Sequence, residues 1–309
     1  MKLVFCGTPG FAVPTLSRLV EAGFSVPLVV TQPDKPRGRG LEISDSPVKQ
    51  RALELGLAVA QPTSIKNNEE FRKQLTELGP DAIIVVGYGR IIPRWMIDLP
   101  QLGNINLHAS LLPKYRGAAP IQWAIARGET VTGVTTMRID AGLDTGDILL
   151  RRELALDASE TSETVAPRLA EIGAELMVET LDGLRDGKIK PRAQDHSRAT
   201  LAPILKKEDG RILFSWSAHE IVNRMRGFRP WPGVFTTFRG KTLNVLAAEA
   251  MDRNTPETEL FVETDRVLVG CGESTSLALI GVQMDGKRRM SARDFVNGYH
   301  LKSGDKLGS

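Results

Sequence analysis

Two short stretches of the sequence carry side chains that can act together on a carbonyl group. The first, residues 106–117, holds an amide at Asn106 and an imidazole at His108, and the second, residues 140–147, holds a carboxylate at Asp144. Residues two apart in a strand point to the same face of a sheet. If Asp144 reaches that face from a loop, a carboxylate-oriented imidazole lies beside a neutral hydrogen-bond donor, which suits transfer of an acyl group to an amine.

The elements around these residues indicate an α/β fold. Apolar runs alternate with segments of helical period, which is typical of βαβ units and predicts a doubly wound, mostly parallel sheet. The expected strands are residues 3–5, 26–30, 82–86, 105–107 and 131–139, and the expected helices are residues 11–22, 48–55, 71–78 and 160–184. Ser46 before Pro47 reads as the start of a helix, and Gly56 as its end.

The rest of the chain predicts a second, smaller domain. Residues 186–207 lose all periodicity and contain Gly, Pro and polar residues, as a linker does. Short strand-like runs follow at residues 234–238, 243–246, 266–270 and 277–283, which indicates a small β-barrel of the OB-like kind or a sandwich. The expected division is therefore a first domain at 1–187, a linker at 188–206 and a β-barrel domain at 207–309.

Composition sets the broad class. With 309 residues, 41% hydrophobic and 25% charged, the sequence is typical of a soluble globular protein of two domains. No signal peptide or membrane span is expected, and the distant Cys6 and Cys271 are expected as reduced core residues. We therefore expect a cytoplasmic protein without a membrane partner, and a monomer.

Two glycine-containing motifs have alternative interpretations. Residues 7–10 (Gly-Thr-Pro-Gly) follow the first strand, but they lack the dinucleotide fingerprint and indicate a structural turn. Residues 140–147 fit either a plain acidic turn or a metal-binding loop. No metal is expected there, because calcium-loop spacing is missing and no His or Cys is near. The glycines at 142 and 146 suggest backbone held close to a ligand, with the Asp144 carboxylate turned inward.

Basic segments suggest contact with a polyanion. Residues 33–40 form a basic, glycine-punctuated stretch expected to be an irregular loop. From Lys206 onward there are 16 Lys and Arg against 13 Asp and Glu, which accounts for the whole net charge of +3. Three arginines are interspersed with two aromatic residues at 224–231, and a second basic group lies at 287–293. Such surfaces bind nucleic acid in some proteins and are merely solvated in others.

Taken together, the motifs resemble those of the methionyl-tRNA formyltransferase family, within the wider 10-formyltetrahydrofolate-dependent formyltransferases. The resemblance rests on residues 7–9, 31–34, 106–108, 110–113, 116–122, 142–147, 231–232 and 290–292, and it covers essentially the whole chain. It implies a Rossmann-like formyltransferase domain followed by a tRNA-binding domain. It also implies transfer of a formyl group from 10-formyltetrahydrofolate to the α-amine of methionyl initiator tRNA.

The resemblance also implies roles for individual residues. Asn106, His108 and Asp144 would be catalytic. The folate site would use Arg90, Ile91, Ile92, Ser110, Leu111, Leu112, Pro113 and Asp140. The tRNA contacts would come from Lys35, Arg37, Arg39, Lys206, Lys207, Arg226 and Arg229. Alternatives remain open at this point: a formyltransferase acting on a ribonucleotide or amino sugar, a hydrolase that releases formate, or a non-catalytic nucleic-acid-binding protein.

Overall fold

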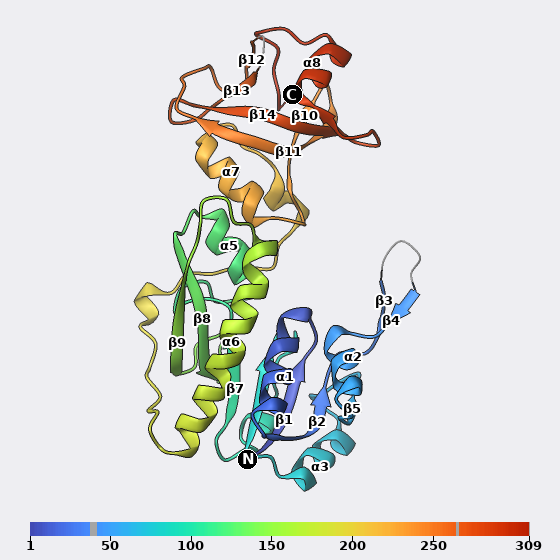
Figure 1. Ribbon diagram of the computed structural model, residues 1–309, viewed down its shortest axis with the longest axis vertical. Coiled ribbons are helices and arrows are strands. Elements are labelled where there is room, and N and C mark those ends of the chain that lie inside the picture. Colours follow the sequence, from blue (N-terminus) through green and yellow to red (C-terminus); the bar gives the residue numbers. More distant parts are fainter. Residues whose placement is uncertain (38–41, 264–265, 309) are drawn as a thin grey trace. The chain divides into compact units, whose positions relative to one another are not determined.

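The computed structural model describes residues 1–37, 42–263 and 266–308, without the side chains of residues 35–37 and 42–43. The chain forms two compact units (Figure 1). The first unit comprises residues 1–118, 131–155 and 166–202, and the second comprises residues 119–130, 156–165 and 203–309. The sequence-based division is linear, and the observed one is not. Residues 188–202, expected as part of a linker, belong to the first unit because Arg192 and Leu201 bridge to Ile148 and Arg116 there.

A seven-stranded sheet organises the first unit, in the order β5-β2-β1-β6-β7-β8-β9. Its strands are β1 (Lys2–Gly7), β2 (Ser25–Val30), β5 (Val59–Ala60), β6 (Ala82–Val86), β7 (Asn104–His108), β8 (Val131–Arg138) and β9 (Ile148–Ala155). Pairing is parallel from β5 through β7 and antiparallel for β8 and β9. The expected doubly wound, mostly parallel sheet is confirmed, and β9 is a strand that the sequence pattern did not predict.

Helices cover both faces of this sheet. They are α1 (Val13–Glu21), α2 (Pro47–Glu54), α3 (Glu69–Leu78), α4 (Arg94–Ile97) and most of α6 (Ser162–Arg185), with short 3-10 turns η1 (Gly10–Ala12) and η2 (His196–Arg198). Gly173 of α6 faces the Leu107 side chain, so α6 covers that face of β7. Asn104, on the other face of β7, donates to backbone carbonyls of α4. The expected start of α2 is confirmed, because Ser46 Oγ accepts from the Lys49 N–H at 3.1 Å.

The face of the sheet that carries Asn104 is buried under α3 and α4 by a continuous apolar cluster. Residues from β1, β2 and β6 pack there against Phe71, Leu75 and Met96. Burial raises the pKa of the Cys6 thiol within this cluster, and it raises the pKa of Cys271 in the second unit to about 12. Both cysteines are free and buried, as expected.

An antiparallel sheet forms the second unit, in the order β10-β11-β14-β13-β12, with β15 added at β14. Its elements are η3 (Lys207–Gly210), α7 (Ala218–Gly227), β10 (Val234–Phe238), β11 (Lys241–Met251), β12 (Leu260–Val262), β13 (Val267–Cys271), β14 (Thr275–Met284), β15 (Met290–Ser291) and α8 (Ala292–Tyr299). Helix α5 (Pro120–Ala126) belongs to the same unit and packs on α7. All four expected strands are present, with different bounds in three of them.

The basic segment after the second strand differs from expectation. It contains a short antiparallel pair, β3 (Lys35–Arg37) and β4 (Glu42–Ser44), in which Lys35 pairs with Ser44 and Arg37 with Glu42. Arg39 lies outside the described residues. At the base of the pair, Lys49 Nζ lies 2.5 Å from Asp34 and 2.7 Å from Asp45.

Over the ranges that the structure describes, none of the helices is both long and apolar enough to cross a membrane.

Candidate active site

Strand β7 places the amide and the imidazole on one face of the sheet. Asn106 lies between Val85 of β6 and Met137 of β8, and His108 pairs with Thr135 of β8. His108 is 6% exposed, whereas Asn106 is half-buried. The Asn106 side chain makes no hydrogen bond with any other described residue, so its amide is available to a ligand.

The turn that follows β7 fixes the imidazole ring. Ser110 Oγ donates to the Lys114 carbonyl at 2.6 Å, and Thr135 Oγ1 donates to the Ser110 carbonyl at 2.6 Å. Tyr115 then adopts a left-handed conformation with φ of 62°. Its carbonyl lies 2.8 Å from His108 Nε2. Because a carbonyl only accepts hydrogen bonds, Nε2 carries a proton, and Nδ1 is the ring nitrogen left for proton exchange.

Asp144 approaches the other side of the ring. One carboxylate oxygen, Oδ2, accepts the Gly117 N–H at 2.8 Å and lies 3.8 Å from His108 Nδ1. The structure therefore brings His108 and Asp144 together, as the sequence predicts. The separation is longer than a hydrogen bond, so the backbone of residue 117, rather than the imidazole, fixes the carboxylate.

The two glycines of this loop make close contacts within the loop and its strand. A Cβ at Gly142 would lie 1.9 Å from Thr145 Oγ1, and one at Gly146 would lie 1.9 Å from the Arg138 carbonyl. Contacts within the protein therefore already require glycine at both positions, and the expected approach of a ligand to this backbone stays a prediction. Asp144, with φ of 50°, is the residue whose backbone is unusual.

Gln194 is a site residue that the sequence reasoning missed. Its amide nitrogen donates to the backbone carbonyls of Asp144 at 2.9 Å and Gly146 at 2.8 Å. Its oxygen accepts from Nη2 of the buried Arg116 at 2.7 Å. Gln194 thus joins the Asp144 loop to the segment after β7. It lies in the stretch expected as a linker, and no local pattern indicates such a contact.

The residues expected at the folate site fall into two groups. Ser110 is fully buried and bonded within its turn, and Leu112 is also fully buried, so both side chains support the turn. Ile91 is 93% exposed and adjoins the buried Ile92. The remaining positions are the partly exposed Leu111 and Pro113, Arg90, which donates to the Thr63 carbonyl, and Asp140, which accepts from Thr145.

Of the residues expected to contact tRNA in the second unit, three are exposed and one is bonded within the protein. Lys206, Lys207 and Arg229 are exposed in the second unit. Arg226 is not free, because its guanidinium donates to the Glu160 carbonyl at 2.8 Å and to Asn223 at 2.7 Å. Burial lowers its pKa below the usual arginine value. Arg226 therefore supports the second unit itself, and a phosphate contact there is not indicated.

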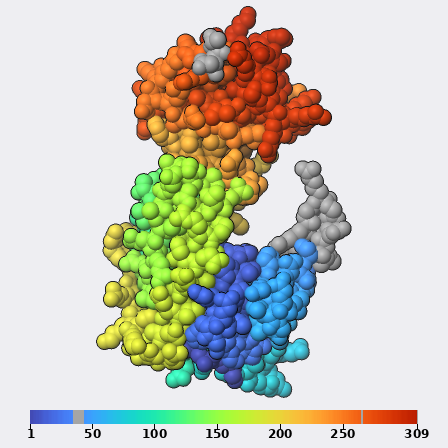
Figure 2. Space-filling model, viewed as in Figure 1, coloured from blue at the N-terminus to red at the C-terminus, as the bar shows by residue number. Residues whose placement is uncertain are grey.

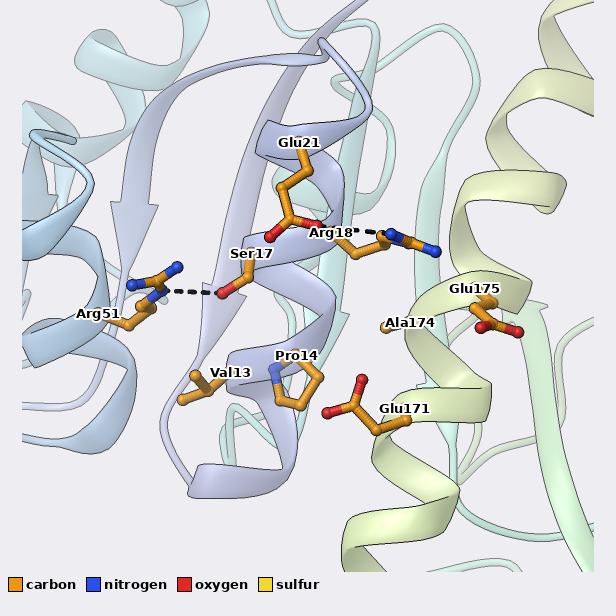
Figure 3. Close-up of a pocket in the computed structure, with 9 residues that line it drawn as sticks. All are labelled: Val13, Pro14, Ser17, Arg18, Glu21, Arg51, Glu171, Ala174 and Glu175. Atoms are coloured by element: carbon orange, nitrogen blue, oxygen red, sulfur yellow. Dashed lines mark hydrogen bonds and ion pairs between the residues drawn. The ribbon is translucent and has the colours of Figure 1, made fainter.

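A separate groove lies on the opposite face of the sheet, between α1 and α6, which are adjacent on the surface in Figure 2. Charged side chains line it, and several are already engaged: Arg18 lies 3.5 Å from Glu21, and Arg51 donates to Ser17 at 2.9 Å (Figure 3). Because α6 covers the Leu107 face, this groove is separated from Asn106 and His108 by the sheet.

Comparison with known proteins identifies the family of this chain. A model of the formyl transferase family matches residues 1–181, and a model of the formyl transferase C-terminal domain matches residues 204–300. Methionyl-tRNA formyltransferase of Koribacter versatilis is 64% identical over 308 residues, covering 100% of this chain and 99% of the relative. That of Acidobacterium capsulatum is 58% identical, covering 100% of both chains.

A solved structure shares the fold. The N-formyltransferase from Helicobacter canadensis, in complex with folinic acid and dTDP-3-aminofucose, matches with a TM-score of 0.69 at 16% identity, covering 92% of this chain and 99% of that chain. The fold, the site and the matched family models define an enzyme that transfers a formyl group. The chain belongs to the formyl transferase family.

Proposed function

We propose that the protein transfers the formyl group of 10-formyltetrahydrofolate to the α-amine of methionyl initiator tRNA. The observation that carries this proposal is the approach of His108 to Asp144 beside the Asn106 amide, which has no hydrogen-bond partner among the described residues. Full-length relatives at 64% and 58% identity, both named methionyl-tRNA formyltransferase, support the choice of acceptor.

The chemistry requires an uncharged amine and a stabilised oxyanion. The amine nitrogen forms a bond to the formyl carbon, and the carbonyl electrons move to oxygen. The tetrahedral intermediate then expels N10 of the folate, which takes up a proton. The Asn106 amide supplies a neutral hydrogen bond to the oxyanion, and such donors contribute about 10²–10³-fold in rate.

His108 accepts and donates the transferred proton at Nδ1, because Nε2 is hydrogen-bonded to the Tyr115 carbonyl. The ring accepts a proton from the attacking amine and returns it at N10, either directly or through water. Asp144, at 3.8 Å, stabilises the positive charge that the ring carries in between. Asp144 is therefore an electrostatic partner of the imidazole.

Binding of the two substrates uses different parts of the chain. The exposed Ile91 and Leu143, at 93% and 62% exposure, offer apolar contact to the pterin ring together with the backbone of residues 90–92 and 140–144. Lys206, Lys207 and Arg229 offer phosphate contacts in the second unit. Lys35, Arg37 and Arg39 are proposed from the family resemblance to meet the acceptor end of the tRNA.

An acceptor panel tests the proposal. Formyl transfer from 10-formyltetrahydrofolate is measured with methionyl initiator tRNA, elongator methionyl-tRNA, free methionine and glycinamide ribonucleotide. We expect product with the initiator tRNA alone, and a fall of about 10²–10³-fold in turnover for Asn106→Ala. Formylation of glycinamide ribonucleotide, or release of formate to water alone, would overturn the assignment of the acceptor.

A further inference from the structure

A second groove in the first unit has no role in the function proposed above. It has a volume of about 540 Å³ and lies along the edge strand β9 and the extended segment after α6. Four basic residues line it against one acidic residue: Arg151, Lys188, Lys190 and Arg192 against Glu153.

The segment after α6 presents its cations in a regular pattern. Lys188, Lys190 and Arg192 are exposed, whereas the intervening Ile189 and Pro191 are half-buried. Ile189 is anchored on Gly183 of α6, and Arg192 forms an antiparallel bridge to Ile148 at the start of β9. Because alternate residues of an extended chain point the same way, the three cations form a row along the sheet edge.

Few of these charges are neutralised within the protein. Lys188 pairs with Asp186 at 2.8 Å. Lys190 and Arg192 make no ion pair with any residue in the described ranges, and Arg151 donates to the Leu112 carbonyl at 3.1 Å without a carboxylate partner there. An open groove with unpaired cations at alternate positions of an extended segment complements a chain of phosphates.

The groove lies close to the candidate active site, because both lie along the same line across the sheet. His108 pairs with Thr135, and Thr135 pairs with Arg151, so the three residues lie in one line across β7, β8 and β9. Residues paired in this way share a face, and two strand spacings amount to about 10 Å. Leu111, in the turn that follows His108, lines the groove itself. A nucleic-acid strand whose end is at His108 therefore reaches Arg151 within a few nucleotides.

We propose that this groove, lined by Arg151, Lys188, Lys190 and Arg192, binds backbone phosphates of the RNA acceptor near its reactive end. The inference rests on the proposed function, since it takes the acceptor to be an RNA. It adds a phosphate-binding surface within the catalytic unit, in a segment that the sequence analysis expected to be a linker.

Direct binding measurements test the groove. The dissociation constant of initiator tRNA is measured across a range of salt concentrations for the full-length wild type and for Lys190→Ala/Arg192→Ala. The matched control is Lys66→Ala/Lys73→Ala, which removes the same charge from exposed positions of the first unit away from the groove. We expect severalfold weaker binding for the groove variant alone. We also expect its log–log salt slope to be less steep by about 0.7 to 0.9 per lost contact.

A charge-conserving variant and a folding control accompany these binding measurements. Lys190→Arg/Arg192→Lys keeps the charges and should bind tRNA like the wild type, and thermal melting shows that all variants fold. Equal affinities and slopes for the groove variant and the control would overturn the proposal. Binding of inorganic phosphate to the groove, without any effect of the variant on tRNA affinity, would also overturn it. Wild-type formylation of methionyl initiator tRNA, assayed in parallel, reports separately on the proposed function.

Discussion

Nδ1 of His108 lies 3.8 Å from Oδ2 of Asp144, and that oxygen accepts its hydrogen bond from the backbone of Gly117. The ring is held at its other nitrogen by the Tyr115 carbonyl at 2.8 Å. The imidazole and the carboxylate are thus fixed independently by the segment that follows β7. This arrangement leaves Nδ1 able to exchange a proton without first breaking a hydrogen bond to Asp144.

The substitution Asp144→Asn removes the carboxylate charge and keeps the position of the side chain. The substituted side chain still offers an oxygen to the Gly117 N–H, so the loop should keep its conformation. Loss of the negative charge beside the imidazole should lower turnover by about 10²-fold or more, because charge on the ring is no longer stabilised. Steady-state kinetics at saturating donor and acceptor checks this. Turnover like that of the wild type would remove the carboxylate from the mechanism.

Gln194→Leu should disturb both the site and the stability of the first unit. It leaves the carbonyls of Asp144 and Gly146 without their donor and removes the acceptor of the buried Arg116. Buried groups without partners cost about 1–3 kcal/mol each. Denaturant unfolding should therefore show a loss of stability, and turnover should fall because the Asp144 loop is no longer held.

A comparison with Thr63→Ala makes this prediction specific, since Thr63 is exposed and its side chain makes no hydrogen bond with the other described residues. Full turnover in Gln194→Leu, with only the stability lowered, would show that Gln194 supports the fold without positioning Asp144.

The local sequence pattern predicts the strand and the loop of the candidate site, but it does not predict the long-range contacts of Gln194 and Arg192. The two-residue period of β7 correctly placed Asn106 and His108 on one face of the sheet, and the turn residues around Asp144 correctly indicated a loop whose carboxylate lies beside His108. Gln194 and Arg192 could not be found in this way, because their partners lie 48 and 44 residues away in sequence, at Gly146 and Ile148, in a segment without periodicity. Contacts of that kind are set by tertiary packing.

Helices α7 and α8, which the sequence analysis did not predict, do carry a local signal in the sequence. Ser217 caps the start of α7, where its side chain accepts from the Glu220 N–H, and Ser291 caps the start of α8, where it accepts from the Asp294 N–H. A serine three residues before an acidic residue is a known helix start. The arginines near the end of α7 were interpreted as nucleic-acid contacts instead. For Arg226 this interpretation conflicts with its hydrogen bonds inside the second unit.

Two arginines of the second unit should therefore behave differently. Arg226→Met removes the donors to Glu160 and Asn223 and should lower the free energy of unfolding by about 1–3 kcal/mol. Arg229→Ala, at an exposed position, should leave stability nearly unchanged and weaken tRNA binding in a salt-dependent way. Denaturant unfolding and tRNA binding are measured for both. A stable Arg226→Met protein with weakened tRNA binding would restore Arg226 as a phosphate contact.

The ion pairs at the base of the β3–β4 pair predict a pH dependence of stability. Hydrogen bonds from Lys49 and then Gln61 hold the pKa of Asp34 below its usual value, and those to Asp34 and Asp45 raise the pKa of Lys49. The contribution of Asp34 is complete above the unfolded aspartate pKa, near 4, and is lost as pH falls through the lower folded value. That of Lys49 is complete below the unfolded lysine pKa, near 10.4, and is lost as pH rises through the higher folded value.

Lys49→Met should therefore lower stability most between these limits, with the difference from wild type shrinking at both extremes. Unfolding in denaturant at a series of pH values measures that difference. Arg51→Met, on the same helix but bonded to Ser17 and Glu54, is the matched control and should not reproduce the acid-side change caused by Asp34. A difference between wild type and Lys49→Met that stays constant from acid to alkaline pH would show that these charges do not support the base of the pair.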